Sequence, residues 1–298
     1  MMKQITLNNS SKDKFADMTY AYVSQFAAAP YVLDEMNNFR AKYNRKSILE
    51  VIYGTNLHAI GRGLCLPSAT CTCLNALCGA RQFDEQSIAS MFRMLLPLHG
   101  ITANNPLTQE PYPHGWQVLT DQGDMYYHAI QYWVNQATNS QVKAHTIVGY
   151  NKLEDLANLV NSSSITVALL LDNRFVIHWV REAEQEMGIQ FIKQDDDGVL
   201  LINTQELHDM PFQSGRHAVS LLDVQNDHVL ISDSFSLPGM TSQQTMRWWP
   251  IDVIAKYTHY QSELPRRAII FTTDKYNSEV KNLVDSFGGV SASPKNIN

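Results

Sequence analysis

The front half of the chain has a helical pattern of apolar residues and the back half a strand-like one. This division constrains the fold more than any other feature. In the front half, apolar residues recur at helical spacing, which predicts helices over residues 13–52, 84–98 and 122–136, the first interrupted at Pro30. In the back half, short runs rich in β-branched residues alternate with turn residues, which indicates strands. The expected elements there are a strand at 145–150, a helix at 152–163, the buried strand ITVALLL (165–171), and the strand-like runs FVIHWV, GIQFIK, GVLLI, HAVSLLDV, HVLISDS and RAIIFTT. This order predicts an α+β fold.

The charge balance argues against a nucleic-acid partner. The 298-residue chain has a formal net charge of −6, whereas a protein that binds the phosphate backbone needs a basic face. The densest basic stretches, Arg40 to Lys46 and Arg266-Arg267, are short. We therefore expect both to be solvated surface.

The sequence also predicts no membrane span. Its most apolar run, residues 165–171, is too short to cross a bilayer. The N-terminal stretch MMKQITLNNSSKDKF lacks the apolar segment of a secretory signal. We expect a cytoplasmic protein as synthesised, with export by a signal-independent route left open.

All four cysteines lie in GLCLPSATCTCLNALCG, residues 63–79. A zinc site is disfavoured because residues 71–78 have the pattern of one helix, which cannot wrap four thiolates around a tetrahedron. Disulfides are disfavoured because we expect a reducing compartment and because helical residues two apart point in different directions. We therefore expect no metal and no cofactor, and we expect Cys71, Cys73 and Cys78 to pack as small buried hydrophobes.

Cys65 differs from the other three cysteines in its local sequence. It follows Gly61 and Gly63, which permit a tight backbone, and precedes Pro67, which is favoured in the first turn of a helix. The unpaired N–H groups at a helix N-terminus favour a thiolate and can also bind an oxyanion. Cys65 is therefore a candidate nucleophile, provided that a histidine lies near it.

The best candidate for that histidine lies in SGRHAVSLLDVQNDHVLISDSFS, residues 214–236. This stretch reads as a strand, a polar turn and a second strand, which together predict a hairpin. His217 opens the first strand and Asp233 closes the second, so the hairpin would make them neighbours. A carboxylate that orients an imidazole is the partner that a thiol nucleophile needs. A salt-bridged pair at a strand edge is the alternative interpretation.

These residues carry a resemblance. Residues 65–69 resemble the cysteine box of papain-like peptidases, and are most similar to the branch of bacteriocin-processing, double-glycine-type peptidases. The pieces that match the rest of that branch are HTIVGY, KLEDLANLV, ITVALLL, HAVSLLDV, HVLISDS and the closing segment WWPIDVIAKY. The resemblance covers roughly residues 54–258. It implies a papain-like fold in which the nucleophile helix packs on an antiparallel β-sheet, with a peptide or protein as substrate.

The resemblance also implies roles for single residues. Cys65 would be the nucleophile, His217 the general base, and Asp233 the residue that holds the imidazole tautomer. Family members carry a glutamine six residues before the cysteine, which helps to form the oxyanion hole, and Ala59 stands at that position here. Asn56 and His58 are the candidates to replace it.

Two other departures from the family pattern concern the glycine after the cysteine and the length of the chain. Leu66 replaces that glycine, and residues 179–213 look like an acidic insertion before the histidine strand, either a lid or a solvated decoration.

His178 directly follows the buried strand and is the alternative base, with Asp195 to Asp197 as its carboxylates. We favour His217 because its hairpin to Asp233 is clearer.

We expect an N-terminal helical extension over residues 1–53, a catalytic domain over 54–275, and a tail over 276–298 that contains Gly288-Gly289. The leading functional hypothesis is a cysteine-dependent hydrolase that forms an acyl-thioester. An acyltransferase or transglutaminase, a glutamine deamidase, and an inactive binding module with the same fold are the alternatives. The sequence does not indicate an oligomeric state.

Overall fold

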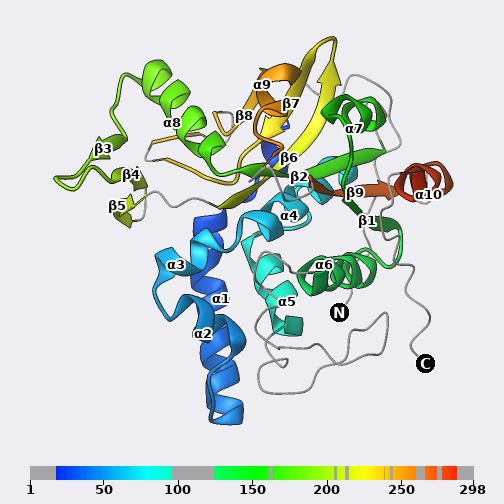
Figure 1. Cartoon of the computed structure of the whole chain (residues 1–298). Coiled ribbons are helices and arrows are strands. Elements are labelled where there is room, and N and C mark those ends of the chain that lie inside the picture. The colour runs from blue at the N-terminus through cyan, green and yellow to red at the C-terminus, as the bar shows by residue number, and fades with distance from the viewer. Residues whose placement is uncertain are drawn as a thin grey trace.

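A six-stranded antiparallel sheet separates two layers of helices in the computed structural model (Figure 1). The model describes residues 18–95, 124–160, 164–204, 207–211, 215–237, 239–241, 244–259, 266–273 and 277–286. The strand order is β1-β9-β2-β6-β7-β8. The strands are β1 (Val142–Val148), β2 (Ile165–Asp172), β6 (Arg216–Gln225), β7 (His228–Ser232), β8 (Met246–Pro250) and β9 (Arg267–Thr273). The chain is therefore an α+β protein, as the order of its helical and strand-like segments predicts.

Each face of the sheet has its own hydrophobic core. One core is formed with the helices α1 (Gln25–Tyr43), α2 (Ile48–Tyr53), α3 (Leu57–Arg62), α4 (Cys65–Cys78), α5 (Glu85–Leu95) and α6 (Asp124–Ala137), which follow the short 3-10 helix η1 (Thr19–Ala21). The other is formed with α7 (Leu153–Val160), α8 (Arg174–Met187), α9 (Ile251–Ala255) and α10 (Asn277–Ser286). A small separate sheet, β3 (Ile192–Gln194), β4 (Leu200–Thr204) and β5 (Leu207–Pro211), extends beyond α8.

Helix α4 is fixed to the sheet by hydroxyl groups as well as by apolar packing. Ser220 Oγ on β6 donates to Ala69 O at 3.1 Å, and Thr166 Oγ1 on β2 donates to Cys73 O at 3.3 Å. The two carbonyls are four residues apart and therefore lie on one face of the helix. These bonds fix the position of α4 relative to β2 and β6, and with it the place of its first residue over the sheet.

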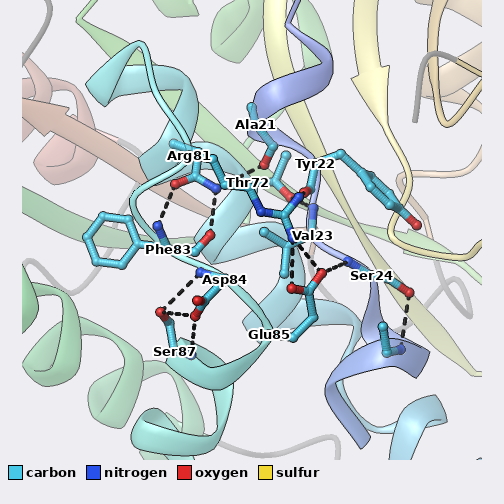
Figure 2. Close-up of polar contacts among 12 residues, drawn as sticks. Ala21, Tyr22, Val23, Ser24, Thr72, Arg81, Phe83, Asp84, Glu85 and Ser87 are labelled. Carbon is cyan, nitrogen blue, oxygen red and sulfur yellow. Dashed lines mark hydrogen bonds and ion pairs between the residues drawn. The ribbon is translucent and has the colours of Figure 1, made fainter. Parts of the chain in front are cut away.

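The segment before α1 is tied to α4 and to the loop after it (Figure 2). Arg81 Nη1 donates to Tyr22 O at 2.6 Å, and Val23 N donates to Thr72 Oγ1 at 3.2 Å. The carbonyl of Tyr22 and the N–H of Val23 thus both have hydrogen-bond partners inside the protein, as buried polar groups require. The start of α1 is consequently held against α4.

Two local predictions were wrong. Helix α1 continues through Pro30, which we expected to interrupt it, although proline removes one backbone hydrogen bond. Packing of its buried face, including Val32 and Met36, outweighs that loss. The run FVIHWV lies in helix α8 rather than in a strand. Over the whole of α8 the buried residues Phe175, Val176, Trp179, Val180 and Ala183 follow helical spacing, which the short window did not show.

Two other expectations concern the C-terminal segment of the chain. Residues 277–286, which we assigned to a tail, form α10, whose Val280 and Val284 are fully buried. Gly288-Gly289 lies outside the described residues. Among the residues that the structure does describe, no helix is long and apolar enough to cross a membrane.

Candidate active site

Cys65 is the first residue of α4, as its local sequence predicts. A tight turn leads into it, in which Gly63 N donates to Ile60 O at 2.9 Å and Leu64 N donates to Gly61 O at 3.1 Å. Because an α-helix leaves its first N–H groups without an intrahelical acceptor, the amides of Cys65 and Leu66 are candidate donors beside the thiol. The position combines a nucleophilic atom with backbone donors.

The two glycines of this turn each make room for an aromatic ring. A Cβ at position 61 would lie 2.5 Å from Phe26 Cδ1, and a Cβ at position 63 would lie 2.5 Å from Tyr53 Oη. Real Cβ atoms do not approach so closely, so only glycine fits at either position without a shift of the ring. Phe26 and Tyr53 therefore lie against the backbone that leads to Cys65.

The other three cysteines have the packing role that the sequence predicts. Cys71, Cys73 and Cys78 are buried, whereas Cys65 is only partly buried. Burial raises the pKa of Cys73 to about 12 and that of Cys78 to about 11, and it raises the pKa of Cys71 well above its ordinary value. A buried thiol with a raised pKa is unreactive. In the part of the chain that the structure describes, no group of three or more His, Cys, Asp or Glu side chains could hold a metal ion.

His217 and Asp233 meet at the open end of the β6–β7 hairpin. Ser220 pairs with Ser232 in this hairpin, so Asp233 lies just beyond the last paired residue. His217 Nε2 is 2.7 Å from Asp233 Oδ1. Both side chains are buried, and the same carboxylate oxygen also accepts a hydrogen bond from Phe235 N at 2.8 Å. The hydrogen bond from Phe235 N thus holds the carboxylate in the orientation in which it contacts the imidazole.

Cys65 lies close enough to His217 to influence its pKa, so the imidazole lies next to both the thiol and the carboxylate. Because Nε2 faces Asp233, the other ring nitrogen, Nδ1, is left for the sulfur. Burial alone would lower the pKa of His217, but the charge and hydrogen bond of Asp233, with a smaller contribution from Cys65, raise it to about 10. The imidazolium form of His217 is therefore favoured at neutral pH.

Gln25 connects the two halves of the site and was missed by sequence reasoning. This buried side chain donates from Nε2 to Gly61 O at 3.1 Å and accepts at Oε1 from Ser234 Oγ at 2.8 Å. It thus links the turn before Cys65 to the residue after Asp233. A single glutamine in a helical stretch carries no recognisable pattern, and only the tertiary contacts show its role.

The candidate oxyanion donors Asn56 and His58 have other contacts. Asn56 is exposed and is the N-cap of α3, where its Oδ1 accepts from His58 N at 2.9 Å and from Ala59 N at 3.2 Å. The ring of His58 stacks on Phe26 at a centroid distance of 5.9 Å. Burial, and secondarily the charge of Arg62, lowers the pKa of His58. The structure does not bring either side chain to Cys65 among its described contacts.

His178, the alternative base, lies on α8 in the other core layer. Its Nδ1 is 2.9 Å from Tyr257 Oη, and its ring packs edge-on against Trp249. It lines a cavity of about 830 Å³ between α8 and β8. Of the carboxylates proposed for it, Asp195 to Asp197, Asp195 instead accepts backbone hydrogen bonds from Asp197 and Val199, and Asp196 and Asp197 are exposed in the same turn. The structure therefore gives His178 neither the expected carboxylate nor the thiol.

Comparison with known proteins adds little to this geometry. No family model matches the chain, and a search of curated proteins found no match. One solved structure, described as a C39-like peptidase from Bacillus anthracis, is similar at 15% identity and a TM-score of 0.27, over 49% of this chain. The chain spans 58% of the length of that structure.

Proposed function

We propose that this protein is a cysteine-dependent hydrolase that acts on peptide or amide bonds through an acyl-thioester at Cys65. The observation that carries the proposal is the position of His217, which lies 2.7 Å from the buried Asp233 and next to Cys65. A nucleophile, a base and an orienting group in contact are the parts that acyl transfer needs. The papain-like arrangement, with the cysteine helix packed on the sheet that carries the histidine, is part of the same proposal.

Each residue has a distinct step in the proposed reaction. The imidazolium of His217 stabilises a thiolate at Cys65, and the sulfur attacks the carbonyl carbon of the substrate. When the tetrahedral intermediate collapses, the carbonyl re-forms and the leaving amine takes the proton of His217. Neutral His217 then removes a proton from water, which attacks the thioester and releases the acid. Asp233 holds the ring and stabilises its charge in both stages.

Acylation with an activated ester tests this proposal without knowledge of the substrate. p-Nitrophenyl acetate should acetylate Cys65 and release nitrophenolate, and intact-mass and peptide mass spectrometry should locate the acetyl group. Cys65→Ala should abolish the site-specific acetylation, and His217→Ala should reduce it strongly, since the thiolate loses its counter-charge. Acetylation spread over other residues, with no contribution from Cys65, would overturn the proposal in favour of a binding module.

A further inference from the structure

The phenol of Tyr53 lies at the turn that precedes Cys65. Tyr53 is the last residue of α2, and its ring lies against Gly63, where a Cβ would meet both its Cζ and its Oη. Gly63 adopts a φ of −80°, which any residue can adopt, so the backbone conformation does not require glycine there. What requires glycine at this position is the space that the phenol occupies.

The phenol also lies within electrostatic reach of the thiol and is held in the donor form. Burial, and secondarily the negative charge of Cys65, raises the pKa of Tyr53 to about 12. A phenol with this pKa keeps its proton at neutral pH and can donate a hydrogen bond. Tyr53 thus combines a fixed position beside the nucleophile with a proton that it does not readily lose.

From this placement we infer that the Tyr53 hydroxyl is a catalytic hydrogen-bond donor to the oxyanion that forms when Cys65 attacks a carbonyl. The inference rests on the proposed function. When the S–C bond forms, the π electrons of the C=O bond move to the oxygen, which accepts hydrogen bonds from the Tyr53 O–H and from backbone amides at the start of α4. When the intermediate collapses, the electrons return to the carbonyl, the leaving group departs with the proton of His217, and the phenol keeps its own proton.

The inference also accounts for Ala59, Asn56 and His58. Ala59 has no side-chain donor, Asn56 caps α3, and His58 stacks on Phe26. Tyr53 comes from a different helix, and its ring lies against the turn at Gly63. No fixed spacing from Cys65 would identify it in the sequence.

Two reactions of the same thiol separate a role in the oxyanion site from a role in folding or in thiolate formation. Acetylation by p-nitrophenyl acetate passes through an oxyanion, whereas alkylation by iodoacetamide is a direct displacement without one. Tyr53→Phe should therefore slow acetylation of Cys65 by about a hundredfold or more, with little change in alkylation. Gly63→Ala, which displaces the phenol without removing it, should also slow acetylation selectively. Tyr43→Phe, at an exposed position on α1, is the matched control and should change neither rate.

The outcomes distinguish the two proposals. Equal acetylation rates in wild type and Tyr53→Phe, with wild-type acetylation dependent on Cys65, would overturn the role of Tyr53 alone. Equal losses of acetylation and alkylation would also overturn it, because Tyr53 would then act on the thiol or on the fold. Absence of Cys65-dependent acetylation in the wild type would overturn the proposed function, and the role of Tyr53 with it.

Discussion

His217 Nε2 lies 2.7 Å from Asp233 Oδ1, and both side chains are buried at the open end of one hairpin. A carboxylate beside an imidazole favours the imidazolium, because its negative charge and its hydrogen bond stabilise the protonated ring. This pair, rather than the thiol alone, distinguishes Cys65 from an ordinary cysteine at a helix N-terminus.

The first prediction concerns Asp233→Asn, which keeps the shape of the side chain and removes its charge. The pKa of His217 should fall toward its ordinary value, because the charge of Asp233 opposes the effect of burial on His217. NMR titration of the His217 ring protons measures this change. Asp227→Asn is the matched control: Asp227 also pairs with a histidine, His228, but on an exposed turn. An unchanged His217 titration in Asp233→Asn would contradict the assigned pairing.

The second prediction is a dependence of stability on pH. The folded-state pKa of His217, about 10, exceeds its ordinary value of 6.5. A raised histidine pKa stabilises the folded state fully below about pH 6.5, and this contribution is lost as the pH rises to about 10. Between these pH values the free energy of unfolding of the wild type should therefore fall more steeply than that of His217→Gln. Denaturant titrations over a pH series measure both slopes, and parallel slopes would be the contrary result.

The third prediction concerns the support of the site by Asn75 in α4. Its amide donates to Ala21 O and Phe83 O, and its carbonyl accepts from the amides of Gln82 and Phe83. Asn75→Ala leaves buried backbone groups without partners, so unfolding should become easier by about 2–4 kcal/mol.

A surface variant provides the control for this prediction. Arg93→Ala, which removes an exposed ion pair with Glu35, should cost less than about 1 kcal/mol. Denaturant unfolding of both variants measures the difference. Equal effects would show that the contacts of Asn75 contribute little.

The fourth prediction concerns His178, the base that the structure places on the other side of the sheet. His178→Ala should leave the rate of Cys65 alkylation within about twofold of wild type, because its described polar contacts are with Tyr257 and Glu182. A loss of reactivity as large as that in His217→Ala would reverse the assignment of the base. The same variants should be compared by circular dichroism so that misfolding is not mistaken for loss of reactivity.

Local sequence was sufficient to predict the elements that hold the candidate site. Glycines before Cys65 and Pro67 after it predicted where α4 begins, and alternation around a polar turn predicted the strands of His217 and Asp233. These features depend on neighbours in the chain, so they can be read without the fold. The catalytic roles of the three residues stay a proposal.

The rest of the site could not be predicted because it depends on contacts between distant segments. Gln25 connects Gly61 to Ser234, and the phenol of Tyr53 meets Gly63 across two helix ends. Neither residue has a periodicity or spacing that marks it. The strand assignment of FVIHWV, now part of α8, failed for a related reason, since its β-branched residues resemble a strand over six positions and show helical spacing only over the full helix.

The central claim is that His217 activates Cys65, and the most direct measurement is the rate of iodoacetamide alkylation at Cys65 at about pH 6, followed by peptide mass spectrometry. The buried Cys71, Cys73 and Cys78 should remain unmodified in the folded protein. We predict that Cys65 reacts at least about tenfold faster than a cysteine in a short model peptide, whose thiol is almost fully protonated at this pH. His217→Ala should remove that advantage. A Cys65 that reacts no faster than the model peptide, and is unaffected by His217→Ala, would contradict the claim.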